Sequence, residues 1–298
     1  MLLIINNWIH HKNKEGLYAM LNYLKLNYTD GSIKDLEEDV DKKYKIIYNP
    51  SENINIHKYD NRDGKRLWLF GPHFSTFPDN KLDIINFNQP NLFYLVPSEW
   101  CVNIWKNIYK VNINIVIIPF PVNSRRFNEI YNINDSRRNK VIIYYKRRNP
   151  HELLYLLNFC ENKKIDYKIF DYVKGYDEND FLNYLHQCKY AIILDACESQ
   201  GFAIQEIMAC NVPMIVWNIY DLSQEYGENS YNPYKATTIP YWSNLCGEVF
   251  YNKDELEQTY NIFIHNLNNG LYKPREFILN NLDIQQCSNI FQKLLITK

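Results

Sequence analysis

The sequence predicts an α/β protein built around parallel β-sheets, and two observations carry this prediction. Short apolar runs of four or five residues, bounded by polar loops, alternate along the chain with stretches of helical periodicity. The clearest unit, residues 190–217, reads strand, turn, helix, strand, and this βαβ unit requires two parallel strands. The chain has 298 residues, of which 46% are hydrophobic, so it is long enough for two domains with separate cores.

The first part of the chain supplies a set of short strands and two main helices. We expect helices over residues 16–26 and from Pro97 to about residue 109, the second with Ser98 as its N-cap. Residues 30–43 are charged, and we expect them to be helical or irregular. The strands are expected at residues 2–5, 45–48, 67–70, 92–96 and 115–118.

A domain boundary is predicted where Pro, Asn, Ser and Arg dominate, in residues 119–139. We therefore place an N-terminal domain at residues 1–125, a second domain at 126–280, and at 281–298 a helix that returns toward the first domain. In the second domain we expect strands at 141–145, 167–172, 191–194, 214–217 and 246–250, helices at 151–160, 180–188, 202–210 and 254–267, and a long functional loop at 220–241.

The turn inside residues 190–217 carries more charge than a structural unit needs. Glu198 lies in its loop, Glu206 lies in the helix that follows, and Gly201 stands between them. A helix N-terminus that follows a strand binds anions through its backbone amides, and ligands of open α/β sheets lie at the carboxyl ends of strands. A ligand with both phosphate and hydroxyl groups would suit this turn.

A second cluster of charge follows the strand at residues 141–145. Lys146, Arg147 and Arg148 stand where the carboxyl end of that strand is expected, and cations there can neutralise a diphosphate. The alternative is a solvated cationic turn. We favour the phosphate site, and the sequence leaves open which two of the three cations would contact it.

The spacing of the turn resembles the E-x7-E signature of family 4 glycosyltransferases. Gln200 stands where the family has an aromatic residue, and Asn211, which tolerates the left-handed conformation, stands where it has a glycine. The resemblance implies a GT-B fold, with two Rossmann-like α/β domains that face each other across a cleft. The residues that match the signature are Glu198, Gly201, Glu206, Met208, Ala209, Cys210 and Pro213.

The resemblance also implies roles for individual residues. Glu198 would bind the transferred sugar and shield its developing positive charge, and His73, which follows the strand at residues 67–70, would face the same sugar. The implied donor-binding residues are Lys146, Arg147 and the amides of Gly201, Phe202 and Ala203 at the diphosphate, Glu206 at the ribose and Tyr176 at the base.

The implied activity is transfer of a sugar from a nucleoside diphosphate sugar to a hydroxyl acceptor of a glycan or glycoconjugate, with retention of configuration. No cofactor or metal is expected, because cations and amides stabilise the leaving group, and the D-x-D formed by Asp39 and Asp41 lies in a charge run that reads as a solvated face. The alternatives are a sugar-nucleotide epimerase, a catalytically silent sugar-nucleotide binding module, and a nicotinamide oxidoreductase, against which the lack of a G-x-G-x-x-G motif argues.

Charge, cysteine content and hydrophobicity indicate which partners and which cellular compartment to expect. Lys and Arg total 33 against 34 for Asp and Glu, so a formal net charge of −1 gives no general attraction for nucleic acid or an anionic membrane. The seven cysteines are spread singly, which is typical of reduced thiols, and no apolar run reaches the length of a membrane span. We therefore expect a cytoplasmic protein without an integral membrane segment, and its oligomeric state stays open.

Overall fold

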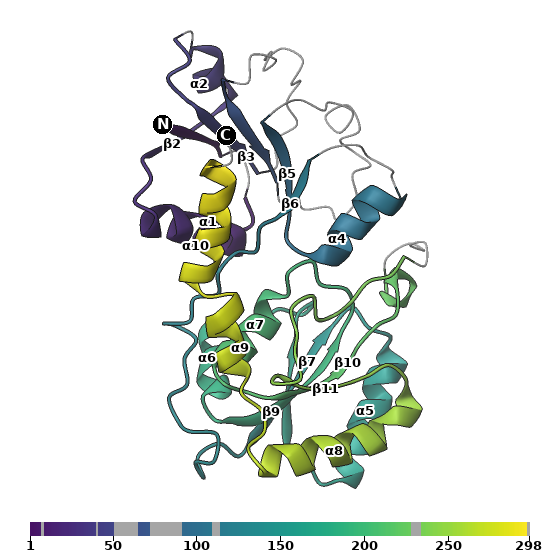
Figure 1. Cartoon of the computed structure of the whole chain (residues 1–298). Helices are drawn as coiled ribbons and strands as arrows, with labels where there is room; N and C mark the ends of the chain where they lie inside the picture. The colour runs from purple at the N-terminus through teal and green to yellow at the C-terminus, as the bar shows by residue number, and fades with distance from the viewer. Residues whose placement is uncertain are drawn as a thin grey trace. The chain divides into compact units, whose positions relative to one another are not determined.

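The computed structural model describes residues 1–6, 9–39, 41–50, 65–71, 91–108, 114–227 and 234–296. The chain forms two compact units: unit 1 comprises Met1–Pro121 together with Ile284–Lys298, and unit 2 comprises Val122–Asp283. Each unit contains a parallel β-sheet with helices packed beside it (Figure 1).

Unit 1 contains a six-stranded sheet in the order β2-β1-β3-β4-β5-β6, and all of its strand pairs are parallel. The helix α10 (Ile284–Ile296) packs beside α1 (His11–Tyr23), although the two helices are far apart in the sequence (Figure 1). The strands are β1 (Leu2–Ile5), β2 (Tyr28–Gly31), β3 (Ile46–Asn49), β4 (Leu67–Phe70), β5 (Leu92–Val96) and β6 (Ile115–Ile117), and the other helices are α2 (Ile33–Glu37), α4 (Glu99–Asn103) and the π-helix η3 (Ile104–Ile108).

Three expectations for unit 1 are corrected by this structure. Residues 28–31 form the edge strand β2 beside β1, so the predicted helical or irregular segment begins too early. Helix α1 begins at His11 rather than at residue 16, and Gly16 is buried within it, where an added Cβ would lie 2.7 Å from the Cβ of Phe120. Asp39 is not on a solvated face: its carboxylate is buried and lies 2.9 Å from the guanidinium of Arg66.

Unit 2 contains a five-stranded sheet in the order β11-β10-β9-β7-β8, again with parallel pairs only. In its central strand β9, every residue except Lys189 is buried, as expected for a parallel sheet covered on both faces. The strands are β7 (Lys140–Lys146), β8 (Tyr167–Asp171), β9 (Cys188–Asp195), β10 (Met214–Trp217) and β11 (Gly247–Phe250).

Helices cover both faces of this sheet (Figure 1). On one face, α5 (Pro150–Asn162) and α8 (Leu256–Asn268) pack on a core that includes Ile143 and Ile192. Successive strand residues point to opposite faces, and Tyr144 accordingly contacts Phe181 of α6 (Glu178–Leu185) on the other face. The remaining helices are α7 (Phe202–Ala209), α9 (Pro274–Asn281) and the 3₁₀-helices η4 (Leu222–Gln224) and η5 (Lys253–Glu255).

Two further corrections concern unit 2. Helix α6 ends at Leu185, so Cys188, expected in that helix, is the first residue of β9. Helix α9 was not expected; its first residue is Pro274, which fits the first turn of a helix because the missing N–H has no helical acceptor there.

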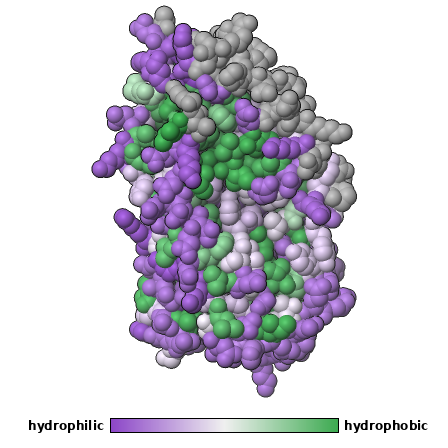
Figure 2. All heavy atoms as spheres, in the orientation of Figure 1, coloured by the Kyte–Doolittle hydropathy of each residue, from purple (hydrophilic) through white to green (hydrophobic). Residues whose placement is uncertain are grey.

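The surface shown in Figure 2 has apolar and hydrophilic side chains interspersed over unit 2. Exposed apolar residues of this unit lie on separate elements, for example Leu154 on α5, Val173 after β8 and Leu271 after α8. No helix in the part of the chain that the structure describes is both long and apolar enough to cross a membrane.

Candidate active site

The site is built at the carboxyl ends of the adjacent strands β7 and β9. In the parallel register of these strands, Lys146 is paired with Asp195, so the loops that follow the two strands begin side by side. The amide of Ala196 donates to the carbonyl of Lys146 over 3.0 Å, which extends the pairing one residue into the loop. Residues 52 positions apart in the sequence are therefore brought together.

Lys146 and Glu198 form an ion pair across these two loops, in which the Lys146 Nζ donates to Glu198 Oε1. Both side chains are only 14% exposed. Burial acts to lower the pKa of Lys146, but the charge and hydrogen bond of Glu198, together with the nearby Asp195 carboxyl group, outweigh burial and raise that pKa above its ordinary value. The same ammonium lies 4.5 Å from the ring centre of Tyr172, so this cation is held by several neighbours.

The backbone around Glu198 is fixed by the end of the loop predicted to be functional. The Glu198 amide donates to the carbonyl of Thr237 over 3.0 Å. The Thr238 hydroxyl is buried and donates to the carbonyls of Asp195 and Ala196, at 3.0 and 2.9 Å. The backbone conformation at Glu198 therefore depends on contacts with residues about 40 positions later in the chain.

Gly201 ends the turn in the left-handed conformation, with a φ of 80°, and α7 begins at the next residue. A side chain is disfavoured at this φ, which explains glycine here. An added Cβ would lie 3.5 Å from the Cβ of Glu198, so Gly201 is beside that residue. Phe202 and Ala203 are the first residues of α7, and the first amides of any helix lack helical acceptors and can bind an anion.

Glu206 and Tyr176 lie close to the same point. Glu206 is a buried carboxylate in the second turn of α7. Burial and the charge of Glu206 raise the pKa of Tyr176, whereas Lys146 lowers it, so the phenol lies within electrostatic range of both. The ring of Tyr176 also packs edge-on against Phe170, at 5.5 Å between centroids, which ties it to the aromatic core beside α6.

Arg147 and Arg148 have different environments. Arg147 adopts a left-handed φ of 47°, and its side chain, 43% exposed, donates to Glu225 over 2.8 Å. Glu225 in turn accepts from Cys197, the neighbour of Glu198, so Arg147 is linked to the turn indirectly. Arg148 is completely buried and contacts both carboxylate oxygens of Glu152 at 2.8 and 2.7 Å. Arg148 is therefore a structural residue, whereas the side chains of Lys146 and Arg147 are partly exposed.

Asp195 is a member of this cluster that the sequence did not single out. Its side chain is completely buried, and among the described residues no donor reaches either carboxylate oxygen. Burial raises the pKa of Asp195 well above its ordinary range; Lys146 opposes this shift, and Glu198 adds to it. An aspartate at the end of an otherwise apolar strand, three residues before Glu198, was the available signal.

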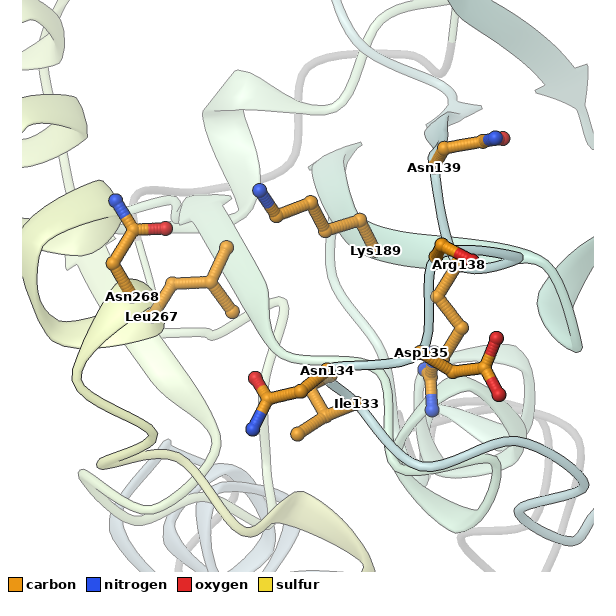
Figure 3. Close-up of a pocket in the computed structure, with 9 residues that line it drawn as sticks. Ile133, Asn134, Asp135, Arg138, Asn139, Lys189, Leu267 and Asn268 are labelled. Carbon is orange, nitrogen blue, oxygen red and sulfur yellow. The ribbon is translucent and has the colours of Figure 1, made fainter.

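A pocket at the opposite end of the sheet is separate from this cluster (Figure 3). It has a volume of about 420 Å³, and Asn139 and Lys189 line it at the amino ends of β7 and β9. Arg138 also lines the pocket. Its guanidinium donates to the backbone carbonyls of Cys188, Tyr131 and Asn211, so it links three segments of the chain. Ligands of parallel α/β sheets bind at the other end of the strands.

The two remaining predictions concern His73 and the absence of a metal ion. His73 lies outside the described residues, so its role stays a prediction. Among the described residues, no three His, Cys, Asp or Glu side chains are grouped so that they could hold a metal ion. All seven cysteines are free thiols, and Cys197 is the one that is not buried.

No protein-family model matches the chain, and no curated protein matches it in sequence. Solved structures do match it. Sucrose-phosphate synthase from Thermosynechococcus elongatus aligns over 97% of this chain and 79% of its own, with 10% identity and a TM-score of 0.55. WaaG, a glycosyltransferase involved in lipopolysaccharide biosynthesis, aligns over 100% of both chains, with 7% identity and a TM-score of 0.53.

A third match is an α-glucosyltransferase in complex with UDP and a 13-mer DNA. It aligns over 100% of this chain and 98% of its own, with 13% identity and a TM-score of 0.51. These proteins are GT-B glycosyltransferases, and this chain has the two α/β units with parallel sheets described above. The chain has a GT-B fold. The predicted fold class is thereby confirmed, while identities of 7 to 13% leave the chemistry to be argued from the site.

Proposed function

We propose that the protein is a glycosyltransferase that moves a sugar from a nucleoside diphosphate sugar to a hydroxyl group of a glycan or glycoconjugate. The observation that carries this proposal is the contact between Lys146 and Glu198 beside the Gly201 turn. It joins a cation and a carboxylate at the ends of adjacent strands in a GT-B fold, and in this proposal the cation binds the diphosphate and the carboxylate binds the sugar. UDP in a solved structure of similar fold favours the same ligand class.

Donor binding would replace the ion pair seen here. In this proposal the diphosphate attracts Lys146 away from Glu198, and Arg147 and the first amides of α7 complete the diphosphate site. Glu206 would accept hydrogen bonds from the ribose hydroxyls. Tyr176, whose ring packs against Phe170, would touch the base.

Electrostatic stabilisation would do most of the chemical work. As the bond between the anomeric carbon and the diphosphate oxygen breaks, its electron pair stays on the diphosphate, beside Lys146 and Arg147. Glu198, released from Lys146, then faces the positive charge that develops on the sugar. The acceptor oxygen forms the new bond, and its proton passes to the departing diphosphate. Such a sequence needs no metal ion, and we expect it to retain the anomeric configuration.

An assay with a panel of nucleotide sugars tests the proposal. Turnover of at least one donor is expected for the wild type, with strong loss in Glu198→Gln, whereas Glu248→Gln on β11, far along the sheet, serves as the matched control. Product analysis separates the alternatives. An epimerised nucleotide sugar would indicate an epimerase, and tight donor binding without any turnover would indicate a silent binding module; either result would contradict the proposal.

The proposal includes the cellular compartment in which the reaction takes place. Seven free thiols agree with a reducing compartment, and we infer a cytoplasmic enzyme that meets its nucleotide sugar there. Fractionation of the native host, with detection of the protein by antibody, would test this, and recovery in a secreted fraction would contradict it.

A further inference from the structure

Asp195 is buried under the proposed donor site, and no hydrogen-bond donor among the described residues reaches its carboxylate. Its backbone is firmly held: the carbonyl accepts from Arg148 over 3.1 Å and from Thr238 over 3.0 Å. Its side chain has no such support among the described residues, where both oxygens are buried and without a donor. A buried ionised carboxylate without hydrogen bonds is strongly disfavoured, so the proton content of this group needs an explanation.

In the described part of the chain, the charged and titratable groups around Asp195 come from β7 and from the loops after β7 and β9. Lys146 and Tyr144 approach from β7, Cys197 and Glu198 approach from the loop after β9, and Arg148 contacts the backbone carbonyl. Lys146 donates to Glu198, not to Asp195. Lys146 therefore lies near both carboxyl groups, and its hydrogen bond goes to Glu198, the more exposed of the two.

We propose that Asp195 is a positioning residue that holds a proton in the folded protein, shares it with Glu198, and so leaves the charge of Lys146 for Glu198 and then for the donor diphosphate. Two carboxyl groups side by side can form a hydrogen bond only when one of them carries a proton. The role toward the diphosphate rests on the function proposed above; the bound proton does not.

The bound proton predicts a pH dependence with a definite sign. The folded protein retains the Asp195 proton to higher pH than the unfolded chain, whose aspartates titrate near pH ~3.9. As pH rises above that value, the unfolded state releases the proton first, so the wild type loses stability until the folded group also titrates. A neutral isostere has no such loss.

Asp195→Asn tests this with urea unfolding between pH 4 and pH 9. We expect the unfolding constant of the wild type, relative to that of the variant, to rise with pH by up to about tenfold per pH unit within the window. Asp171→Asn is the matched control at the neighbouring strand end, where the carboxylate accepts from the amides of Val173 and Lys174. A stability difference between Asp195→Asn and wild type that does not change with pH would overturn the inference.

A second measurement keeps the test decisive if Asp195→Asn does not fold. Carbon NMR of wild-type protein labelled at the aspartate carboxyl carbons should show one carboxyl that titrates well above the ordinary aspartate range. If no aspartate does so, the inference is wrong.

UDP serves as the probe for the role at the site. Calorimetry should show that UDP affinity falls at alkaline pH in the wild type and falls less in Asp195→Asn, because ionised Asp195 competes for Lys146. Equal pH dependence in both proteins would overturn the positioning role. Absence of UDP binding to either protein, together with a positive NMR result, would contradict the proposed function as applied to UDP and leave the bound proton established.

Discussion

At the scale of single residues, three consecutive cations after β7 illustrate what the sequence could and could not predict. The cationic cluster could be predicted, because charged residues at the carboxyl end of a strand differ clearly from the apolar run before them. The different roles of the three cations could not be predicted, because these roles depend on carboxylates elsewhere in the chain. Lys146 pairs with Glu198, Arg147 with Glu225, and the buried Arg148 with Glu152.

Asp195 shows the same limit. It ends an apolar strand and looks like the start of a polar loop, but its side chain is completely buried. Only the strand pairing reveals that Lys146 lies opposite. Burial of a polar residue by non-local contacts leaves little trace in the local sequence pattern.

Glu206→Gln should weaken donor binding. The change keeps the size of the side chain and removes its charge, so hydrogen bonds from ribose hydroxyls become weaker by about 1 to 3 kcal/mol. Calorimetry with the donor identified by the panel assay would measure this. Glu248→Gln is the control, because Glu248 contacts Asn266 and Tyr272 on another part of the sheet. An affinity equal to that of wild type would remove Glu206 from the ribose.

At the scale of secondary-structure elements, the buried strands were the most predictable parts. The strands β1, β4, β5 and β10 have the predicted limits, because strands of a covered parallel sheet are continuous apolar runs. The edge strand β2 has the sequence YTDG and is mostly exposed or half-buried, so it carries no such signal. Helix α9, with few buried residues, was missed for a similar reason.

Arg148→Met should destabilise unit 2 strongly. The methionine fills much of the space but removes the Arg148 donors from the carboxylate of Glu152 and from the carbonyls of Asp195 and Trp217. Loss of one partner of a buried ion pair costs about 3 to 5 kcal/mol. Urea unfolding at pH 7 would measure the change in the free energy of unfolding.

Arg147→Met is the matched control for that measurement. Its side chain is 43% exposed and pairs with Glu225, so we expect a change within about 1 kcal/mol. If Arg148→Met were as mild as Arg147→Met, Arg148 would not be the structural residue inferred here, and it would again be a candidate for the diphosphate.

For the whole molecule, the fold is similar to that of solved structures although the sequence identity is very low. No family model matches, and identities to the solved structures are as low as 7%, yet the GT-B fold is retained. Sheet order and apolar periodicity tolerate nearly complete replacement of residues, as long as the faces stay buried. The sequence could therefore predict the fold class from periodicity and one βαβ motif.

Metal independence is a prediction for the whole enzyme. With a formal net charge of −1, the protein must hold a diphosphate locally, and Lys146, Arg147 and the start of α7 can do so. Activity measured with a chelator present should equal activity without it. The D-x-D acids offer no ready substitute, because Asp39 is paired with Arg66. Inactivation by chelation that magnesium or manganese reverses would contradict this prediction.

Calorimetry of nucleoside diphosphates, with UDP, GDP and ADP as probes, on wild type and Lys146→Met tests whether the end of β7 binds the donor. We expect at least one probe to bind the wild type, and Lys146→Met to weaken that binding about tenfold or more, because a charge-assisted contact to the diphosphate is lost. Lys168→Met, on β8 and paired with Asp180, should bind as the wild type does. Equal affinity in Lys146→Met and wild type, or no binding of any probe, would contradict the assignment of the donor site.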